Sequence, residues 1–291
     1  MALYYMKDNA LRPVNGVYQC VDKFGGNFNT MALSYFFRQN ARVVVTSSKN
    51  NNPSYLINNA ETGTKLLLSG TITGGSGSTY YCAMLNECNF VKANGKIYTI
   101  KIPTEQHAVN GYFDENAWVY VSYSTKTTNF QFRAVNSYLF LRNTLQKFSK
   151  DVIWDEVKIS ANDEGGFVTQ AEVNVTTGEI SKVISVSKDI TLKGPISFKG
   201  NYIIALLPTI LPQGFTFTAI SDGKVVYKKS VEYVEFNRNI VESFKIELSE
   251  LDLQEIGSAY TRVGPELKQI YQTYTETETE TETETETEET L

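Results

Sequence analysis

The sequence predicts an all-β protein with two β-sandwich domains in tandem, and three observations lead to this fold class. The chain has 291 residues, 42% of them hydrophobic and 12% aromatic, which suffices for the cores of two domains. Its 18 Tyr and 16 Phe, against 7 Pro, favour pleated, half-buried surfaces over helices. Short apolar segments also recur along the chain between turn-forming residues, with the spacing of a β-sandwich.

Residues 1–41 lack the regular strand pattern of the rest of the chain. We interpret them as an N-terminal arm or docking segment. The arm contains a dense apolar run in which Met31, Tyr35, Phe36 and Phe37 need burial. Such a segment either supplies a strand to its own body or docks on a partner, and the sequence leaves both alternatives open. The first residues lack a basic segment followed by a long apolar run, so we expect no secretion signal in the sequence as written.

The first sandwich is predicted to span residues 42–136. Its expected strands are 41–47, 64–73, 79–85, 96–102, 117–123 and 130–140. Turn clusters are expected at 49–53, which is rich in Asn, and at 93–95. The glycines of 70–77 lack the Lys of a phosphate-binding loop, so we interpret this segment as a flexible turn.

The second sandwich is predicted to span residues 137–249. Its expected strands are 155–160, 170–175, 183–186, 189–192, 201–207, 214–220, 224–229 and 243–248. Alternation predicts that Phe215 and Phe217 face the core while Thr216 and Thr218 face water. The sequence Ser-Asp-Gly at 221–223 predicts a hairpin turn.

A polar linker is expected at 250–274, with a short helix opening at Pro265. It is followed by a Thr-Glu repeat tail at 275–291, which contains eight Glu and no basic residue. Alternation places the threonines on one face of an extended strand and the glutamates on the other. We interpret the tail as solvated and acidic, or as a contact to a basic partner surface through Glu276, Glu278, Glu280, Glu282, Glu284 and Glu286.

Several segments resemble the fimbrillin and Mfa-like pilins of Bacteroidetes. The segments 100–107, 111–117 and 130–136 are similar to the late part of a fimbrillin N-terminal domain. The run Tyr-Ile-Ile-Ala-Leu-Leu-Pro at 202–208, with Gly-Phe-Thr-Phe-Thr at 214–218 and Asp-Gly-Lys after it, is similar to the C-terminal domain pattern. The resemblance implies two transthyretin-like sandwiches and subunits that assemble into surface fibres and adhere, without catalysis. It also implies an apolar C-terminal donor strand, which the Thr-Glu tail does not provide.

Catalytic and metal-binding sets are missing from the sequence. His107 is the only histidine, so a His-based metal cluster or a Ser-His-Asp site lacks material, and we expect this residue to cap a loop. Cys20, Cys82 and Cys88 form an odd set, which we interpret as reduced thiols, with a Cys82–Cys88 bridge as the alternative. We therefore expect no enzyme, no metal and no cofactor.

Two tryptophans carry the one ligand-binding hypothesis at this stage. Trp118 and Trp154, with nearby tyrosines, are candidates for a platform on which a glycan stacks. Aromatic rings that alternate along sandwich strands belong far more often to the cores, and this is the interpretation we favour.

These observations predict a non-enzymatic structural or adhesive surface protein. The first hypothesis is a virion component, a head or tail fibre or decoration protein of a phage infecting Bacteroidetes, because of the arm, the unusual tail and the lack of a leader. The alternative is a fimbrial subunit or tip adhesin in a cell-surface fimbrium, and a second alternative is a carbohydrate-binding module. We expect a homo-oligomer or multimer with other structural proteins of the same assembly, and a glycan or other receptor on a cell surface.

Two classes of function are excluded at this stage. The net charge is −5, and without the eight glutamates of the tail it is −5 + 8 = +3, so the body shows no basic footprint for nucleic acid. No stretch approaches the ~18 consecutive apolar residues of a membrane-spanning helix.

Overall fold

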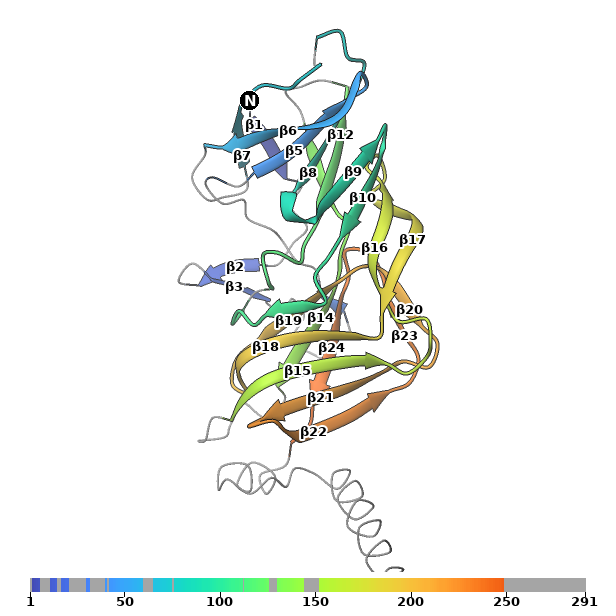
Figure 1. The fold of residues 1–291 in the computed structure, drawn as a ribbon. Helices are drawn as coiled ribbons and strands as arrows, with labels where there is room; N and C mark the ends of the chain where they lie inside the picture. The colour runs from blue at the N-terminus through green and yellow to red at the C-terminus, as the bar shows by residue number, and fades with distance from the viewer. Residues whose placement is uncertain are drawn as a thin grey trace, which may run out of the picture.

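A computed structural model describes residues 2–5, 11–14, 17–20, 30–31, 40, 42–59, 65–74, 76–111, 113–125, 130–143 and 152–248, of which 2–31, 65–67 and 142–143 are described by their backbone alone. Strands dominate, and the described residues contain a single short 3-10 helix, η1 (Glu87–Asn89). The strands form two sandwiches stacked along the long axis of the molecule (Figure 1). The predicted all-β, two-sandwich fold is confirmed.

The first sandwich is built on a closed barrel with the strand order β1-β13-β12-β8-β5-β6-β7. Its strands are β1 (Ala2–Tyr5), β5 (Arg42–Ser47), β6 (Asn50–Asn58), β7 (Lys65–Ser69), β8 (Tyr81–Leu85), β12 (Tyr120–Ser124) and β13 (Gln131–Ala134). One core cluster joins apolar side chains of these strands to large aromatic side chains, among them Phe113, Trp118 and Phe130. Burial of these rings between paired strands is what stabilises this half of the molecule.

A four-stranded sheet in the order β17-β16-β10-β9 covers the outside of the barrel. Its strands are β9 (Phe90–Asn94), β10 (Ile97–Lys101), β16 (Phe167–Asn174) and β17 (Glu179–Ser187). Cys82 and Met84 of β8 pack in one apolar cluster with Tyr98 and Ile100 of β10. The hairpin β16–β17 comes from the part of the sequence where we expected the second sandwich, yet β16 pairs with β10 of the first.

The second sandwich packs the sheet β11-β18-β15-β21-β22 against the sheet β19-β14-β24-β4. The strands of the first sheet are β11 (Glu105–His107), β15 (Ile153–Ala161), β18 (Asp189–Ser197), β21 (Phe215–Ser221) and β22 (Lys224–Val231). Those of the second are β4 (Thr30–Met31), β14 (Ser137–Asn143), β19 (Tyr202–Leu206) and β24 (Val241–Ile246). Two two-stranded sheets complete the fold, β2 (Leu11–Val14) with β3 (Val17–Cys20) and β20 (Thr209–Leu211) with β23 (Val234–Phe236).

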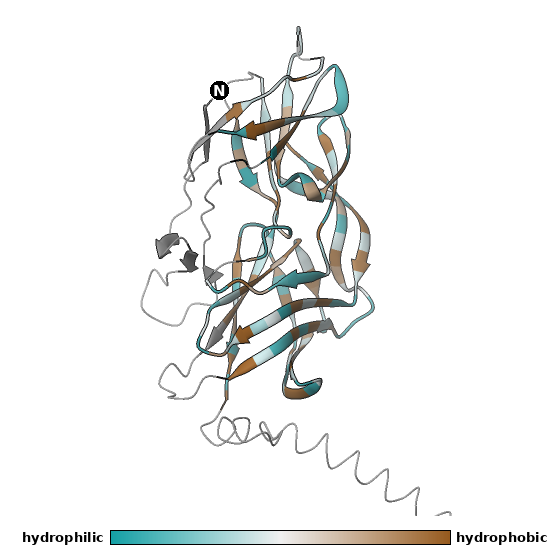
Figure 2. Ribbon diagram, turned by 60° about the vertical axis from the view of Figure 1, so that its left-hand side comes forward, coloured by the Kyte–Doolittle hydropathy of each residue, from teal (hydrophilic) through white to brown (hydrophobic). Residues whose placement is uncertain are grey.

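Hydrophobic and hydrophilic residues alternate along several strands of the second sandwich (Figure 2). Phe215 and Phe217 are buried as predicted. Thr218 is only 8% exposed, so the prediction that it faces water is wrong. Lys158 and Lys228 lie directly opposite Thr218 on the two neighbouring strands. Their long side chains lie on the same face of the sheet as the small Thr218 side chain and cover it.

The hairpin turn predicted after β21 is confirmed. Asp222 and Gly223 have φ angles of 51° and 73°, which is the left-handed pair that a two-residue type I′ turn requires. The turn expected at 49–53 is wrong in part, because Asn50–Asn58 forms strand β6. Pairing with β5 decides this segment against its local preference, since Asn and Pro are depleted in strands.

Two short segments of the arm pair with the body. β1 pairs with β13 and β7, and Met31 of β4 lies opposite Val241 of β24. These pairings follow the first of the two alternatives for the arm, a strand supplied to its own body. Tyr35, Phe36 and Phe37 lie outside the described residues, as do the linker at 250–274 and all the glutamates of the Thr-Glu tail.

Candidate functional site

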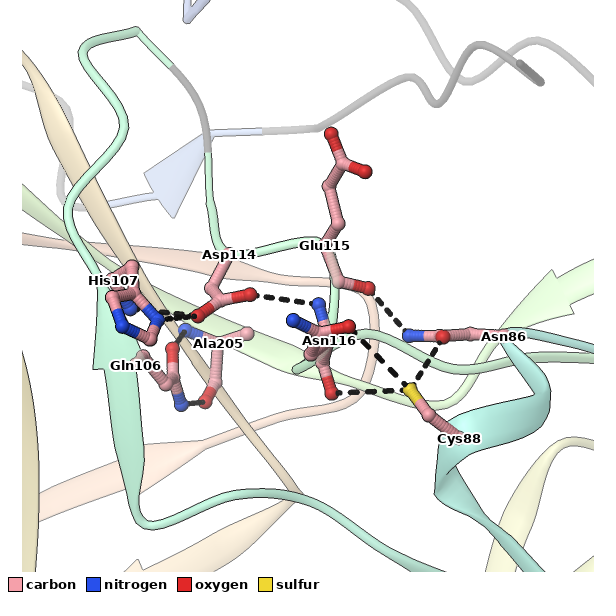
Figure 3. Close-up of polar contacts among 8 residues, drawn as sticks. All are labelled: Asn86, Cys88, Gln106, His107, Asp114, Glu115, Asn116 and Ala205. Atoms are coloured by element: carbon pink, nitrogen blue, oxygen red, sulfur yellow. Dashed lines mark hydrogen bonds and ion pairs between the residues drawn. The ribbon is translucent and has the colours of Figure 1, made fainter. Parts of the chain in front are cut away.

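A polar cluster lies between the two sandwiches, where β11 meets the turn at 113–117 (Figure 3). Gln106 of β11 is fully buried. Its Nε2 donates a hydrogen bond to the Ala205 carbonyl at 2.7 Å, and its Oε1 accepts one from the Ala205 N–H at 3.0 Å. This pair of bonds ties β11, an edge strand of one sheet, to β19 of the facing sheet.

The neighbouring residue, His107, faces an acidic side chain. Asp114 Oδ2 accepts the backbone N–H of His107 at 2.7 Å and lies 3.2 Å from the ring Nδ1. Asp114 Oδ1 accepts the Asn116 N–H at 2.8 Å. The Asp114 side chain is 6% exposed and that of His107 is 73% exposed. Backbone donors thus engage both carboxylate oxygens, so this pair orders the turn, as a loop cap does.

Cys88 completes the cluster from η1. Its Sγ donates to Asn86 Oδ1 at 2.8 Å and lies 3.8 Å from Asn116 Oδ1. Burial raises the pKa of the Cys88 thiol above its ordinary value of 9.0, so the thiol stays protonated near neutral pH. The thiolate is the nucleophilic form of cysteine. The arrangement therefore disfavours covalent chemistry at Cys88.

The alternative of a Cys82–Cys88 disulfide is wrong, because both thiols are free. Cys82 is buried between the barrel and its covering sheet, and this burial raises the pKa of its thiol to about 12. The interpretation of reduced thiols is confirmed for these two residues. Only the backbone of Cys20 is described.

The two thiols are expected to differ sharply in reactivity. In a Cys20→Ser variant at pH 8, a thiol-specific reagent should modify Cys88 alone, and more slowly than in urea, because the raised pKa of Cys88 lowers its thiolate fraction. The rate should still rise above pH 9. Cys82 should react only on unfolding. Equal rates for both thiols in the native protein would contradict this placement.

The hypothesis of a glycan platform at Trp118 and Trp154 is wrong, and the favoured interpretation as core residues is confirmed. The two residues are only 4% and 1% exposed. Trp154 packs edge-on against Phe198 and Phe217, with ring centroids 5.8 and 6.3 Å away. Large aromatic rings contribute most when they are removed from water, so the cores take both tryptophans and neither is available to a sugar.

The structure offers neither a metal site nor a membrane-spanning helix within the residues that it describes. In the described part of the chain, no group of three or more His, Cys, Asp or Glu side chains is placed to hold a metal ion. Over the same residues, no helix has the length and apolar character needed to cross a membrane.

Comparison with solved structures gives matches of fold. A "putative cell adhesion protein" from Bacteroides uniformis aligns with a TM-score of 0.50 at 14% identity, over 74% of this chain and 89% of its own. The two chains share a fold. A protein of the same description from Bacteroides ovatus aligns with a TM-score of 0.48 at 11% identity, over 84% of this chain and 90% of its own. A fimbrial assembly protein from Parabacteroides distasonis reaches a TM-score of 0.39 at 11% identity, over 76% of this chain and 90% of its own.

The fold expected from the fimbrillin resemblance is thereby confirmed. No family model matches the sequence, and no curated protein matches it either. The likeness therefore lies in the arrangement of strands, which is kept while nearly all side chains differ.

Proposed function

We propose that this protein is a non-enzymatic adhesive or structural subunit of a cell-surface fimbrium. The observation that carries the proposal is the shared fold with the Bacteroides uniformis protein, whose description names cell adhesion. The virion role was our first hypothesis. None of the similar structures named above is a phage protein, and this favours the fimbrial alternative.

The character of the polar cluster supports a role without catalysis. Gln106, Asp114 and Asn86 each direct their polar atoms at backbone groups of neighbouring strands and turns. A catalytic group instead leaves its reactive atom facing a substrate. Gln106 ties β11 to β19 and Asp114 orders the turn next to it, so these side chains serve the structure of the junction.

Immunogold electron microscopy of the source cells tests the proposal. Antibody raised against the purified full chain is expected to label filaments or the outer surface of intact cells. A strain that lacks the gene should lose the label, and its complemented derivative should regain it. Label confined to the cell interior, or to phage particles in the culture medium, would overturn the proposal.

A further inference from the structure

We propose that the free end of the first sandwich binds an acidic carbohydrate, at a surface formed by Lys49, Tyr80, Lys96 and Tyr123 that we call the distal surface. The proposal rests on the proposed adhesive function, because it names the class of receptor that an adhesive subunit would hold. The β5–β6 and β9–β10 turns lie at the end of the molecule opposite to β21 and β22 (Figure 1). A ligand there meets neither the second sandwich nor the junction.

Lys96 is held over two aromatic rings. Its Nζ lies 5.1 Å from the ring centroid of Tyr80 and 4.7 Å from that of Tyr123. The two rings are 5.6 Å apart and both pack against the buried cluster between the barrel and its covering sheet. A cation over aromatic faces is attracted by the ring quadrupoles. The ammonium group is thus positioned in advance for an anion.

Lys49 provides a second positioned cation. Its Nζ donates to the Ser76 carbonyl at 3.0 Å. The glycine-rich segment that contains Ser76, which we expected to be a flexible turn, is itself tied to the barrel, because the Thr73 N–H donates to Ser54 Oγ at 2.8 Å. The turn therefore gives Lys49 a fixed partner.

Two hydrogen bonds join the segments that carry the two lysines into one surface. The N–H of Ser48, next to Lys49, donates to the Tyr80 carbonyl at 3.0 Å. The N–H of Gly95, next to Lys96, donates to Asn51 Oδ1 at 2.8 Å. Both lysines thus belong to one hydrogen-bonded set of turns.

Carboxylates are scarce around this surface. The described residues of 42–104 contain a single acidic residue, Glu87, which pairs with Arg42 at 2.7 Å. Residues 117–143 contain none. Within the described residues neither Lys49 nor Lys96 makes an ion pair, although β17 brings Glu179 within two strands of Ile97. Two fixed ammonium groups without a counter-ion make this end of the molecule a receptor for anions.

The chemistry of the surface favours an acidic sugar over nucleic acid. Half-buried tyrosines offer rigid apolar ring surface at low entropic cost, which suits a sugar ring. Double-stranded nucleic acid carries one charge per about 1.7 Å, and its tight binders neutralise many phosphates. Two positioned lysines on a chain of net charge −5 match the sparser charge of a polysaccharide with at most one acidic group per sugar.

Binding of the full chain to polygalacturonate, measured by biolayer interferometry in low salt, tests the proposal. Uncharged dextran and single-stranded oligothymidylate serve as the other probes. The wild-type chain is expected to bind polygalacturonate and to bind the other two at least tenfold more weakly. The double variant Lys49→Ala/Lys96→Ala should lose at least tenfold in affinity.

Matched variants separate the effect of how Lys96 is positioned from the general effect of positive charge. Tyr123→Ala should weaken binding severalfold because Lys96 loses one of its rings, whereas Tyr123→Phe should bind as the wild type does. Lys228→Ala, which removes an exposed lysine from β22, should change nothing. Thermal melting confirms that each variant is folded.

Three results would overturn the inference: no binding to polygalacturonate, equal binding to oligothymidylate, or a double variant that binds as Lys228→Ala does. Immunogold labelling with the double variant expressed in the cells keeps the two proposals apart. Surface label combined with lost binding to the acidic polymer supports both. Surface label without any wild-type binding removes only the carbohydrate inference, and loss of all surface label removes the fimbrial proposal.

Discussion

The Gly214→Ala variant is expected to unfold at a temperature roughly 10 °C below that of the wild-type protein. Gly214 has a φ angle of 70°, which is strained for any residue with a Cβ atom. A Cβ built there would lie 1.5 Å from the Glu232 carbonyl oxygen and 1.8 Å from that of Val231. Backbone cannot yield as a flexible side chain does, so the turn before β21 must shift.

The chain contains a matched control for this prediction. Gly223 has nearly the same φ angle, 73°, but nothing lies within 4 Å of an added Cβ. Gly223→Ala therefore carries the conformational cost alone, about 1–2 kcal/mol. Gly214→Ala adds the close contact and should cost roughly 3–5 kcal/mol, at about 2–4 °C per kcal/mol for a chain of this size. Equal melting temperatures for the two variants would contradict the close approach of the β22 backbone.

Replacing Asn136 with alanine should lower the free energy of unfolding by about 3–5 kcal/mol, since each buried backbone group left without a partner costs about 1–3 kcal/mol. Asn136 is fully buried between β13 and β14. Its Oδ1 accepts the Val119 N–H at 2.5 Å, and its Nδ2 donates to the carbonyls of Ala117 at 2.9 Å and Leu206 at 3.1 Å. One side chain thus joins the first sandwich to β19 of the second.

Urea unfolding at equilibrium measures this loss as a lower midpoint. The control is Asn162→Ala, since the Asn162 Nδ2 also donates to a backbone carbonyl, that of Gln213 at 2.9 Å, but at an exposed position. Water replaces that bond, so the control should change the free energy of unfolding by less than about 1 kcal/mol. A midpoint for Asn136→Ala that matches the control would show that burial of this amide contributes nothing.

Sequence reasoning predicted correctly those features that depend only on the residues of a single strand and its turn. The alternation at Phe215 and Phe217 and the Asp-Gly turn after them are local features, and both were predicted. It failed at β6, where the Asn-rich segment becomes a strand because β5 supplies the hydrogen bonds. At the two tryptophans the interpretation as core residues is confirmed, because rings on sandwich strands contribute most when they are removed from water.

The candidate sites were less accessible to sequence reasoning than the fold. Lys49, Lys96, Tyr80 and Tyr123 lie on four different segments, and no spacing in the sequence connects them. One signal was available beforehand, the scarcity of acidic residues between Arg42 and Thr104, which sequence reasoning did not use. Asn136 gave no signal, because a buried amide and an exposed one look alike in a sequence.

By itself the sequence determined the class of fold, since its aromatic and β-branched residues alternate with turns at the spacing of sandwich strands. Only the tertiary structure decided which strands become neighbours: β16 and β17 cross back to cover the barrel, and β11 joins β18. Side-chain alternation specifies which face of a strand is buried, whereas the choice of partner depends on hydrogen bonds and packing between segments far apart in the chain.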